Sequence, residues 1–350
     1  MLKINKKTKT LIKISLPIII GLILFWLVFK HIDIENFIET VKNANAGYIL
    51  LYFLVSYLIT FLGVIRWKLI LDAQKHKKIS FFYLVKAYLA GYAVSYITPS
   101  AKLGGEPVKA ALLKRKGLET HKVLSTIIID KMMEIGGSGL FFIIGAIILS
   151  VNYALPSNLK FLIIILCLMF IGLIGLAIYY VTQEKGFILS VYKFFRSHKM
   201  KKWTNTTRKI IETEKMIVSF YKKDKKNFLY ALFVMAIAWG LMFVEYKLAM
   251  LIFGFNGNLL QIFLAFSVVG AAYIIPVPFA MGTLEGGQVA LFNAINLNSA
   301  IGLSVGLLTR VKDSILAGIG LVIAAYYGVA KKENITESSK FNKEVFGKNL

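Results

Sequence analysis

The stretch YITPSAKLGGEPVKAALLKRKG, residues 96–117, interrupts a largely apolar part of the chain with two prolines, three glycines and six charged residues. A shorter stretch of the same kind, PFAMGTLE, occupies residues 278–285. Its proline and its glutamate lie 179 residues after Pro99 and Glu106, and in each stretch a glycine stands between the two. Two interruptions with the same spacing predict an internal repeat.

The composition of the whole chain is typical of a protein that spans a membrane. Of the 350 residues, 57% are hydrophobic and 17% are charged, and the mean hydropathy is +0.68, which is too apolar for a soluble core of this size. A helix needs about 20 residues to cross the roughly 30 Å hydrocarbon layer. Eight hydrophobic segments approach or exceed this length: 11–29, 46–64, 81–97, 135–151, 161–181, 228–253, 259–275 and 303–330. We therefore predict an all-α polytopic membrane protein.

The positive charge is distributed unevenly along the chain, whose formal net charge is +24. Basic residues concentrate in the segments 1–10, 72–78, 114–122 and 182–227. The segments 151–158, 254–258 and 293–300 carry no charge. Basic loops stay on the cytoplasmic side of a membrane, so this asymmetry predicts a cell-membrane protein with both termini cytoplasmic. It explains the charge without nucleic-acid binding.

The same topology requires the two interruptions to turn back within the membrane. The hydrophobic segment 81–97 starts from the cytoplasmic side, and the basic segment 114–122 that follows it must also be cytoplasmic. The turn residues expected from this path are Pro99, Gly104, Gly105 and Pro107 in the first interruption, and Pro276, Pro278 and Gly282 in the second. Non-helical backbone at this depth persists only where protein or a watery cavity satisfies its amides. We expect the turns to border a polar cavity.

We predict one transmembrane domain, residues 11–330, built from two inverted repeats with Pro/Gly re-entrant half-helices. The repeats cover about 46–151 and 228–330, with a basic cytoplasmic loop at 182–227, a basic tail at 1–10 and a polar tail at 331–350. Inverted repeats with broken helices are the architecture of many secondary transporters. The alternative is that two ordinary interfacial loops match by chance.

Charged residues inside the hydrophobic segments are the candidate functional groups. A charge at the centre of a transmembrane helix costs about 2.5–3.5 kcal/mol on insertion scales, so it is rarely kept without a role. The residues expected to bind substrate are Glu106 and Glu285 at the two turns, with Lys102, Lys109 and Arg310. The residues expected to balance or gate charge are Arg66, Asp130, Lys131, Glu134, Lys312 and Asp313. The helix N-termini that follow the turns favour an anion, which predicts a phosphate-bearing ligand. A network that only stabilises the fold is the alternative.

Catalytic and metal-binding motifs do not emerge from the sequence. The four histidines have no helical spacing to one another, and the single cysteine, Cys167, lies in an apolar segment. There is no phosphate loop, zinc-binding His-Glu motif or nucleophile elbow. We therefore expect neither an enzyme nor a cofactor or metal site.

Several of these stretches resemble the lysylphosphatidylglycerol synthase transmembrane domain family, also called flippase-like domain proteins. The resemblance rests on RWKLIL (66–71), TPSAKLGGEPVKAALL (98–113), IIIDKMMEIGG (127–137), PVPFAMGTLEGG (276–287) and LLTRVKDSILAGIG (307–320). It implies a lipid translocator, without the soluble aminoacyl-transferase domain of full-length synthases. The family's second motif reads Pro-Gly-Gly-x-Gly, whereas Phe279 and Ala280 replace the glycine pair here.

The function expected from these observations is transport of an anionic or phosphate-bearing lipid between leaflets. The partner is then a membrane phospholipid or a lipid-linked substrate, and a homo-oligomer is left open. The alternative is a non-transporting membrane partner, or an intramembrane lipid-modifying enzyme that acts with a separately encoded glycosyltransferase.

Overall fold

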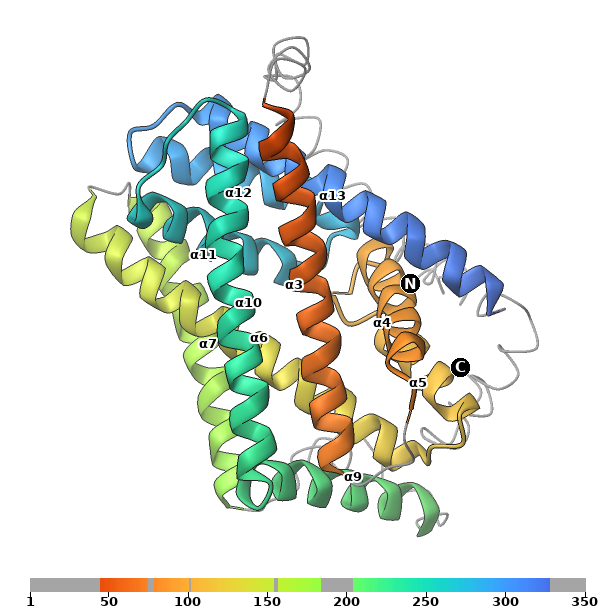
Figure 1. Cartoon of the computed structure of the whole chain (residues 1–350). Coiled ribbons are helices and arrows are strands. Elements are labelled where there is room, and N and C mark those ends of the chain that lie inside the picture. Colours follow the sequence, from red (N-terminus) through yellow and green to blue (C-terminus); the bar gives the residue numbers. More distant parts are fainter. Residues whose placement is uncertain (1–44, 75–78, 101, 154–156, 184–203, 328–350) are drawn as a thin grey trace, which may run out of the picture.

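The computed structural model describes residues 45–74, 79–100, 102–153, 157–183 and 204–327. These residues form ten α-helices and one short 3₁₀ turn, and no strand occurs among them (Figure 1). The predicted all-α fold is therefore confirmed. The first hydrophobic segment, 11–29, and the two predicted tails lie outside the described residues.

Four of the described helices are long and apolar enough to cross a membrane. They are α3 (Ala46–Ala73), α6 (Thr120–Asn152), α7 (Ser157–Thr182) and α10 (Lys225–Ile252). The 28 residues of α3 extend about 42 Å at 1.5 Å per residue, which exceeds the roughly 30 Å hydrocarbon layer. Large apolar side chains such as Leu54 and Phe161 are exposed on these helices, as expected for contact with lipid. The chain is a multi-pass membrane protein.

A further long helix, α13 (Ser299–Tyr326), carries three charged residues near its middle, Arg310, Lys312 and Asp313. A helix with charges at this position is stable in a membrane only when they face protein or a watery cavity. Seven of the eight predicted hydrophobic segments fall on described helices, α13 among them. The number of membrane crossings stays a prediction.

The first interruption is a helical hairpin. Helix α4 (Phe81–Ile97) ends just before Thr98 and Pro99, and α5 (Glu106–Arg115) packs back against it. Thr98 is extended, with φ −87° and ψ 141°, which is the conformation that a following proline favours. Pro107 lies in the first turn of α5, where its missing N–H is not needed. The break and the returning helix occur where the sequence predicted them.

The second interruption is a hairpin of the same kind. Helix α11 (Leu259–Ile274) is followed by a 3₁₀ turn (Pro278–Ala280) and then by α12 (Thr283–Ala294), which packs against α11. Both predicted interruptions therefore join a longer helix to a shorter returning one. Their depth in a membrane is an expectation from the charge pattern.

Three residues of the second turn have left-handed backbone. The φ angles are 59° at Phe279, 48° at Ala280 and 77° at Gly282. Glycine adopts this conformation freely, whereas a side chain crowds the following carbonyl oxygen. Phe279 and Ala280, which stand where the resemblance implies a glycine pair, thus have the backbone that glycine would favour. The turn is formed despite the two substitutions, at the expense of local strain.

The helices contact one another in matched pairs. The hairpin α4–α5 corresponds to α11–α12, and the contact between α5 and α6 corresponds to the one between α12 and α13. Helix α4 packs along α13, and its counterpart α11 packs along α6. Helices α3 and α10 pack against each other, near the centre of Figure 1. We call α3–α6 the first set and α10–α13 the second set; that they form an inverted repeat stays a prediction.

Glycines allow the closest of these contacts. A Cβ atom at Gly105 would lie 1.7 Å from the carbonyl oxygen of Gly91 on α4. A Cβ atom at Gly320 on α13 would lie 2.1 Å from the carbonyl oxygen of Leu89, also on α4. Any side chain at either position would push α5 or α13 away from α4. Gly105 is thus required by close packing, since its own φ is −86°.

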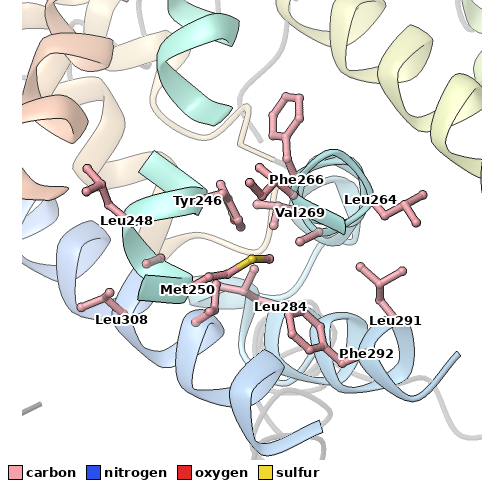
Figure 2. Close-up of a cluster of buried hydrophobic side chains, with 14 of the residues drawn as sticks. Tyr246, Leu248, Met250, Leu264, Phe266, Val269, Leu284, Leu291, Phe292 and Leu308 are labelled. Carbon is pink, nitrogen blue, oxygen red and sulfur yellow. The ribbon is translucent and has the colours of Figure 1, made fainter. Parts of the chain in front are cut away.

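Buried apolar side chains hold the second set together. Figure 2 shows Met250 on α10, Phe266 on α11, Leu284 and Phe292 on α12 and Leu308 on α13 within one cluster. Helices in a membrane associate largely through such close van der Waals packing. The cluster therefore fixes how the charged residues of α10 and α13 face each other.

Helix α9 (Thr204–Lys222) is the described part of the predicted basic loop. It lies across the lower ends of α7 and α10, roughly at right angles to both in Figure 1, and it also packs against the first half of α6. Its apolar side chains Ile217 and Phe220 are buried against the bundle, while charged residues such as Arg208 are exposed. Residues 184–203 of the same loop lie outside the described part of the chain.

Candidate functional site

A cavity of about 260 Å³ lies between the first and second sets. Nine charged side chains of the described residues line it: Arg66, Lys102, Glu106, Lys109, Lys131, Glu134, Glu245, Lys312 and Asp313. Aromatic side chains complete the wall: Tyr88, Tyr92, Tyr96, Trp239, Tyr246, Phe266 and Tyr273. The first predicted turn borders this cavity through Lys102 and Glu106, as expected for non-helical backbone within a membrane.

Glu106 is held by two ammonium groups. Its Oε1 atom lies 3.3 Å from the Nζ atoms of both Lys109 and Lys131. Lys131 also lies 2.7 Å from Glu134, and Lys109 stands over the ring of Tyr88, 4.6 Å from its centroid. The other oxygen of Glu106, Oε2, is buried and has no hydrogen-bond partner among the described residues. These four predicted residues therefore form one neutral cluster at the start of α5.

Arg66 on α3 is paired with Asp130 on α6. Arg66 Nε donates to Asp130 Oδ1 at 2.8 Å, and both residues are buried. Its burial and its partner make Arg66 a link between two helices of the first set.

Lys102 differs from the other cations of the cavity. Its Nζ atom stands 3.4 Å from the centroid of the Tyr273 ring, a favourable cation–π arrangement. Its backbone has φ 60°, and its carbonyl oxygen accepts a hydrogen bond from Ser95 Oγ at 3.0 Å. Among the described residues it is the only cation lining the cavity that has no carboxylate within 4.0 Å.

Glu285 and Arg310 lie outside the lining of this cavity. Arg310 Nε donates to Glu285 Oε1 at 2.5 Å, and Arg310 Nη1 donates to the carbonyl oxygen of Phe279 at 2.8 Å. The Gly282 N–H donates to Glu285 Oε2 at 3.1 Å, and Glu285 is completely buried. The geometry therefore joins these two predicted substrate binders to the second turn, whose strained backbone they stabilise.

An ionic triad of Glu245, Lys312 and Asp313 lies on the wall formed by the second set. Lys312 Nζ is 2.9 Å from Glu245 Oε1 and 3.6 Å from Asp313 Oδ1. Ser56 Oγ on α3 donates to Glu245 at 2.5 Å, and the Tyr273 hydroxyl donates to Asp313. Glu245, Ser56 and Tyr273 are not among the site residues predicted from the sequence.

A constant spacing of 179 residues relates the two sets and could have revealed Glu245. It relates Glu106 to Glu285, Lys131 to Arg310, Glu134 to Asp313 and Arg66 to Glu245. The pairs Lys131–Glu106 and Arg310–Glu285 thus occupy equivalent places. At the position shared by Arg66 and Glu245 the charge is reversed, and so is the charge of the partner on the neighbouring helix.

The arrangement suits binding through charge and hydrogen bonds. Among the described residues, no group of three His, Cys, Asp or Glu side chains is placed to hold a metal ion. The cavity offers ammonium donors, hydroxyl groups and aromatic faces, and a phosphate group is a natural acceptor for such donors.

The fold and the cavity define a class: a multi-pass all-α membrane protein with paired ionic groups between two related sets of helices. The chain belongs to the family described as the lysylphosphatidylglycerol synthase TM region, whose model matches residues 14–319. The resemblance seen in the sequence is thereby confirmed.

Related proteins share most of their length with this chain. A UPF0104 membrane protein from Pyrococcus horikoshii is 25% identical over 311 residues, which cover 84% of this chain and 91% of the relative. One from Methanocaldococcus jannaschii is 23% identical over 326 residues, covering 88% and 92%. One from Methanothermobacter thermautotrophicus is 21% identical over 341 residues, covering 92% and 98%.

Proposed function

We propose that this protein moves a phosphate-bearing lipid between the leaflets of the cell membrane by holding its headgroup in the cavity. The acyl chains would stay in contact with lipid along the apolar outer helices. Three features support this proposal: membership of the family, the apolar surface of the bundle, and a polar cavity between two related sets of helices. Ligand sites in transporters of this architecture lie at the interface of the repeats.

The observation that carries the proposal is the contact of the Lys102 ammonium with an aromatic ring in place of a carboxylate. A cation removed from water is unfavourable unless an anion or a dipole compensates it. Arg66, Lys109, Lys131 and Lys312 each have a carboxylate partner, whereas Lys102, within the part of the chain that the structure describes, contacts the face of Tyr273 and no carboxylate. A phosphate oxygen would give Lys102 the charged partner that it lacks, and a charge-assisted hydrogen bond is stronger than a neutral one.

The size of the cavity agrees with a headgroup rather than with a whole lipid. Its volume is about 260 Å³, somewhat below the range of about 300–1,000 Å³ usual for sites that enclose drug-sized ligands. A glycerophosphate-sized group fits such a space, and the tails of a lipid do not. This agrees with transport in which only the polar part of the lipid enters the protein.

The remaining candidate residues take supporting roles in this proposal. Glu106 would hold Lys109 and Lys131 in place beside the phosphate. Arg310 and Glu285 would fix the second turn. The exchange of the inward and outward openings would follow from two similar sets adopting each other's conformation, as in other inverted-repeat transporters. The cytoplasmic location of both termini belongs to the same proposal.

The test is lipid movement in proteoliposomes that contain a fluorescent phosphatidylglycerol. We expect the wild type to move this lipid between leaflets. The Lys102→Gln variant should slow movement by about tenfold or more, which corresponds to a loss of at least 1.4 kcal/mol of stabilisation. Lys68→Gln is the matched control, because Lys68 lies on α3, half exposed and paired with Asp72. A wild type that moves no lipid, or a Lys102→Gln variant as fast as Lys68→Gln, would refute the proposal.

A further inference from the structure

The charges of the cavity cancel overall but not locally. The five lining cations Arg66, Lys102, Lys109, Lys131 and Lys312 are balanced by four lining carboxylates, Glu106, Glu134, Glu245 and Asp313, together with Asp130, which pairs with Arg66 from outside the lining. The Arg66–Asp130 pair is neutral, and so is the cluster at the start of α5. Within the described part of the chain, this leaves one positive charge without a carboxylate partner, on Lys102, and one excess negative charge, on the ionic triad of Glu245, Lys312 and Asp313.

Both unbalanced charges contact the side chain of Tyr273. The Lys102 ammonium stands over the face of its ring, and the Tyr273 hydroxyl donates to Asp313. Through these contacts the positive charge of Lys102 compensates the triad. A monoanionic phosphate bound to Lys102 would remove that compensation and leave the cavity with a net charge of −1.

We propose that the ionic triad takes up one proton when a monoanionic phosphate headgroup binds Lys102, so that lipid and proton cross the membrane together. This inference rests on the proposed function and adds a proton site to it. Charges interact strongly where water is scarce, so restoring neutrality favours uptake of one positive charge. The proton would bind a carboxylate oxygen of Glu245 or Asp313 and would return to water when the phosphate leaves.

The geometry of the triad suits a proton better than a larger cation. Glu245 Oε1 already accepts hydrogen bonds from Ser56 and Lys312, and both Asp313 oxygens have partners in Lys312 and Tyr273. A sodium ion would require several free oxygen ligands. An ammonium group of a lipid would be repelled by Lys312, which occupies the space between the two carboxylates. A proton adds no volume.

Other titratable groups near the triad do not compete for this proton. They are Tyr52 on α3, Tyr92 and Tyr96 on α4, Lys102 before α5, Tyr246 on α10 and Tyr273 on α11. Phenols ordinarily lose their proton only near pH 10, so they are neutral at pH 7. Helix α6 contributes Lys131 and Glu134, whose charges cancel each other at 2.7 Å. The two carboxylates of the triad are left as the proton acceptors.

The experiment imposes gradients on proteoliposomes that contain the wild type and a trace of fluorescent phosphatidylglycerol, a monoanion. One proton for each lipid makes transport electroneutral, so a membrane potential should have no effect. A pH difference of one unit should concentrate the labelled lipid about tenfold in the leaflet on the alkaline side, since one unit is a factor of ten in proton concentration. A sodium gradient should have no effect.

The Asp313→Asn variant sharpens the test, because it removes the excess negative charge. We expect its lipid movement to lose dependence on the pH gradient and to respond to a membrane potential. If this variant does not fold, Glu245→Gln replaces it. If neither variant folds, the responses of wild-type lipid movement to pH, potential and sodium test the proposal by themselves. Lipid movement by the wild type that ignores pH but follows potential or sodium would overturn the proton proposal and leave the proposed function intact. Movement restricted to a zwitterionic lipid and independent of pH would also overturn it. No lipid movement at all would refute the proposed function itself.

Discussion

Lys131 on α6 stands 3.3 Å from Glu106 on the wall of the cavity, and the equivalent pair 179 residues later lies outside the cavity lining, with Glu285 fully buried. In that second pair, Arg310 and Glu285 are 2.5 Å apart, and the guanidinium also binds carbonyl oxygens of the second turn. One ion pair has thus been placed in two environments. The Lys131–Glu106 pair faces the cavity and can interact with a ligand, whereas the Arg310–Glu285 pair binds the backbone of the second turn.

The Arg310–Glu285 pair should contribute more to stability than the Lys131–Glu106 pair does. Replacing Arg310 with Met leaves Glu285 buried without its cation, which costs about 3–5 kcal/mol when a buried pair is broken from one side. Lys131→Met is the matched change in the first set, where Glu106 keeps Lys109 as a partner and Glu134, which also loses its cation, has a side chain that is 33% exposed. We expect Arg310→Met to lower the thermal unfolding temperature in detergent clearly more than Lys131→Met does. Equal effects would contradict the difference in role.

Ala280 should be a position where glycine is tolerated or preferred. Its φ is 48°, and relief of this left-handed strain is worth about 1–2 kcal/mol, which offsets the loss of one buried methyl group of about 0.8 kcal/mol. Ala249, equally buried but inside helix α10, is the control, since glycine there costs about 1 kcal/mol in helix propensity as well. Thermal unfolding should show Ala280→Gly as stable as the wild type or more stable, and Ala249→Gly less stable. The reverse order would show that the turn is not strained.

Gly105 should not accept even a methyl group. The new Cβ would meet the Gly91 carbonyl oxygen at 1.7 Å and force α5 away from α4. Overpacking of this kind costs about 1–3 kcal/mol, and it would also displace Glu106 and Lys109. Gly136→Ala on α6 is the control, because a Cβ there meets nothing within 4 Å. The expected result is a lower unfolding temperature and lost lipid movement for Gly105→Ala only.

The neutral cluster at the start of α5 should tolerate conservative changes better than loss of charge. Lys109→Arg keeps the cation beside Glu106, whereas Lys109→Gln leaves this carboxylate with Lys131 alone. We expect Lys109→Gln to weaken binding of phosphatidylglycerol by about tenfold or more, because one charge-assisted hydrogen bond is worth about 1.5–3 kcal/mol. Lys109→Arg should remain closer to the wild type. Binding can be compared by lipid titration in detergent, and unchanged affinity in both variants would exclude Lys109 from the site.

The sequence predicted the parts of this fold that depend on local composition. Apolar segments identified the helices, and prolines identified the breaks at Pro99 and Pro278, because proline acts on its own neighbourhood. Helix α6 begins at Thr120 rather than near residue 135, since its first turns carry polar residues that buried contacts support. A search for hydrophobic segments does not detect such a start.

The candidate site was predicted in part for a similar reason. Lys102, Glu106 and Lys109 border the cavity because they belong to the interruption itself. Glu245 reaches the site through contacts with residues far along the chain, Ser56 and Lys312, which no local pattern encodes. Whether Arg310 faces the cavity or the second turn depends on the rotation of α13, and tertiary packing decides that rotation.

The position of a bound phosphate tests the central claim most directly. An experimental structure of the protein with phosphatidylglycerol should place a phosphate oxygen within about 2.7–3.2 Å of the Lys102 ammonium. The lipid tails should lie outside the cavity, along the apolar outer helices. A lipid phosphate found only at the surface of the bundle, with Lys102 still resting on Tyr273, would contradict it.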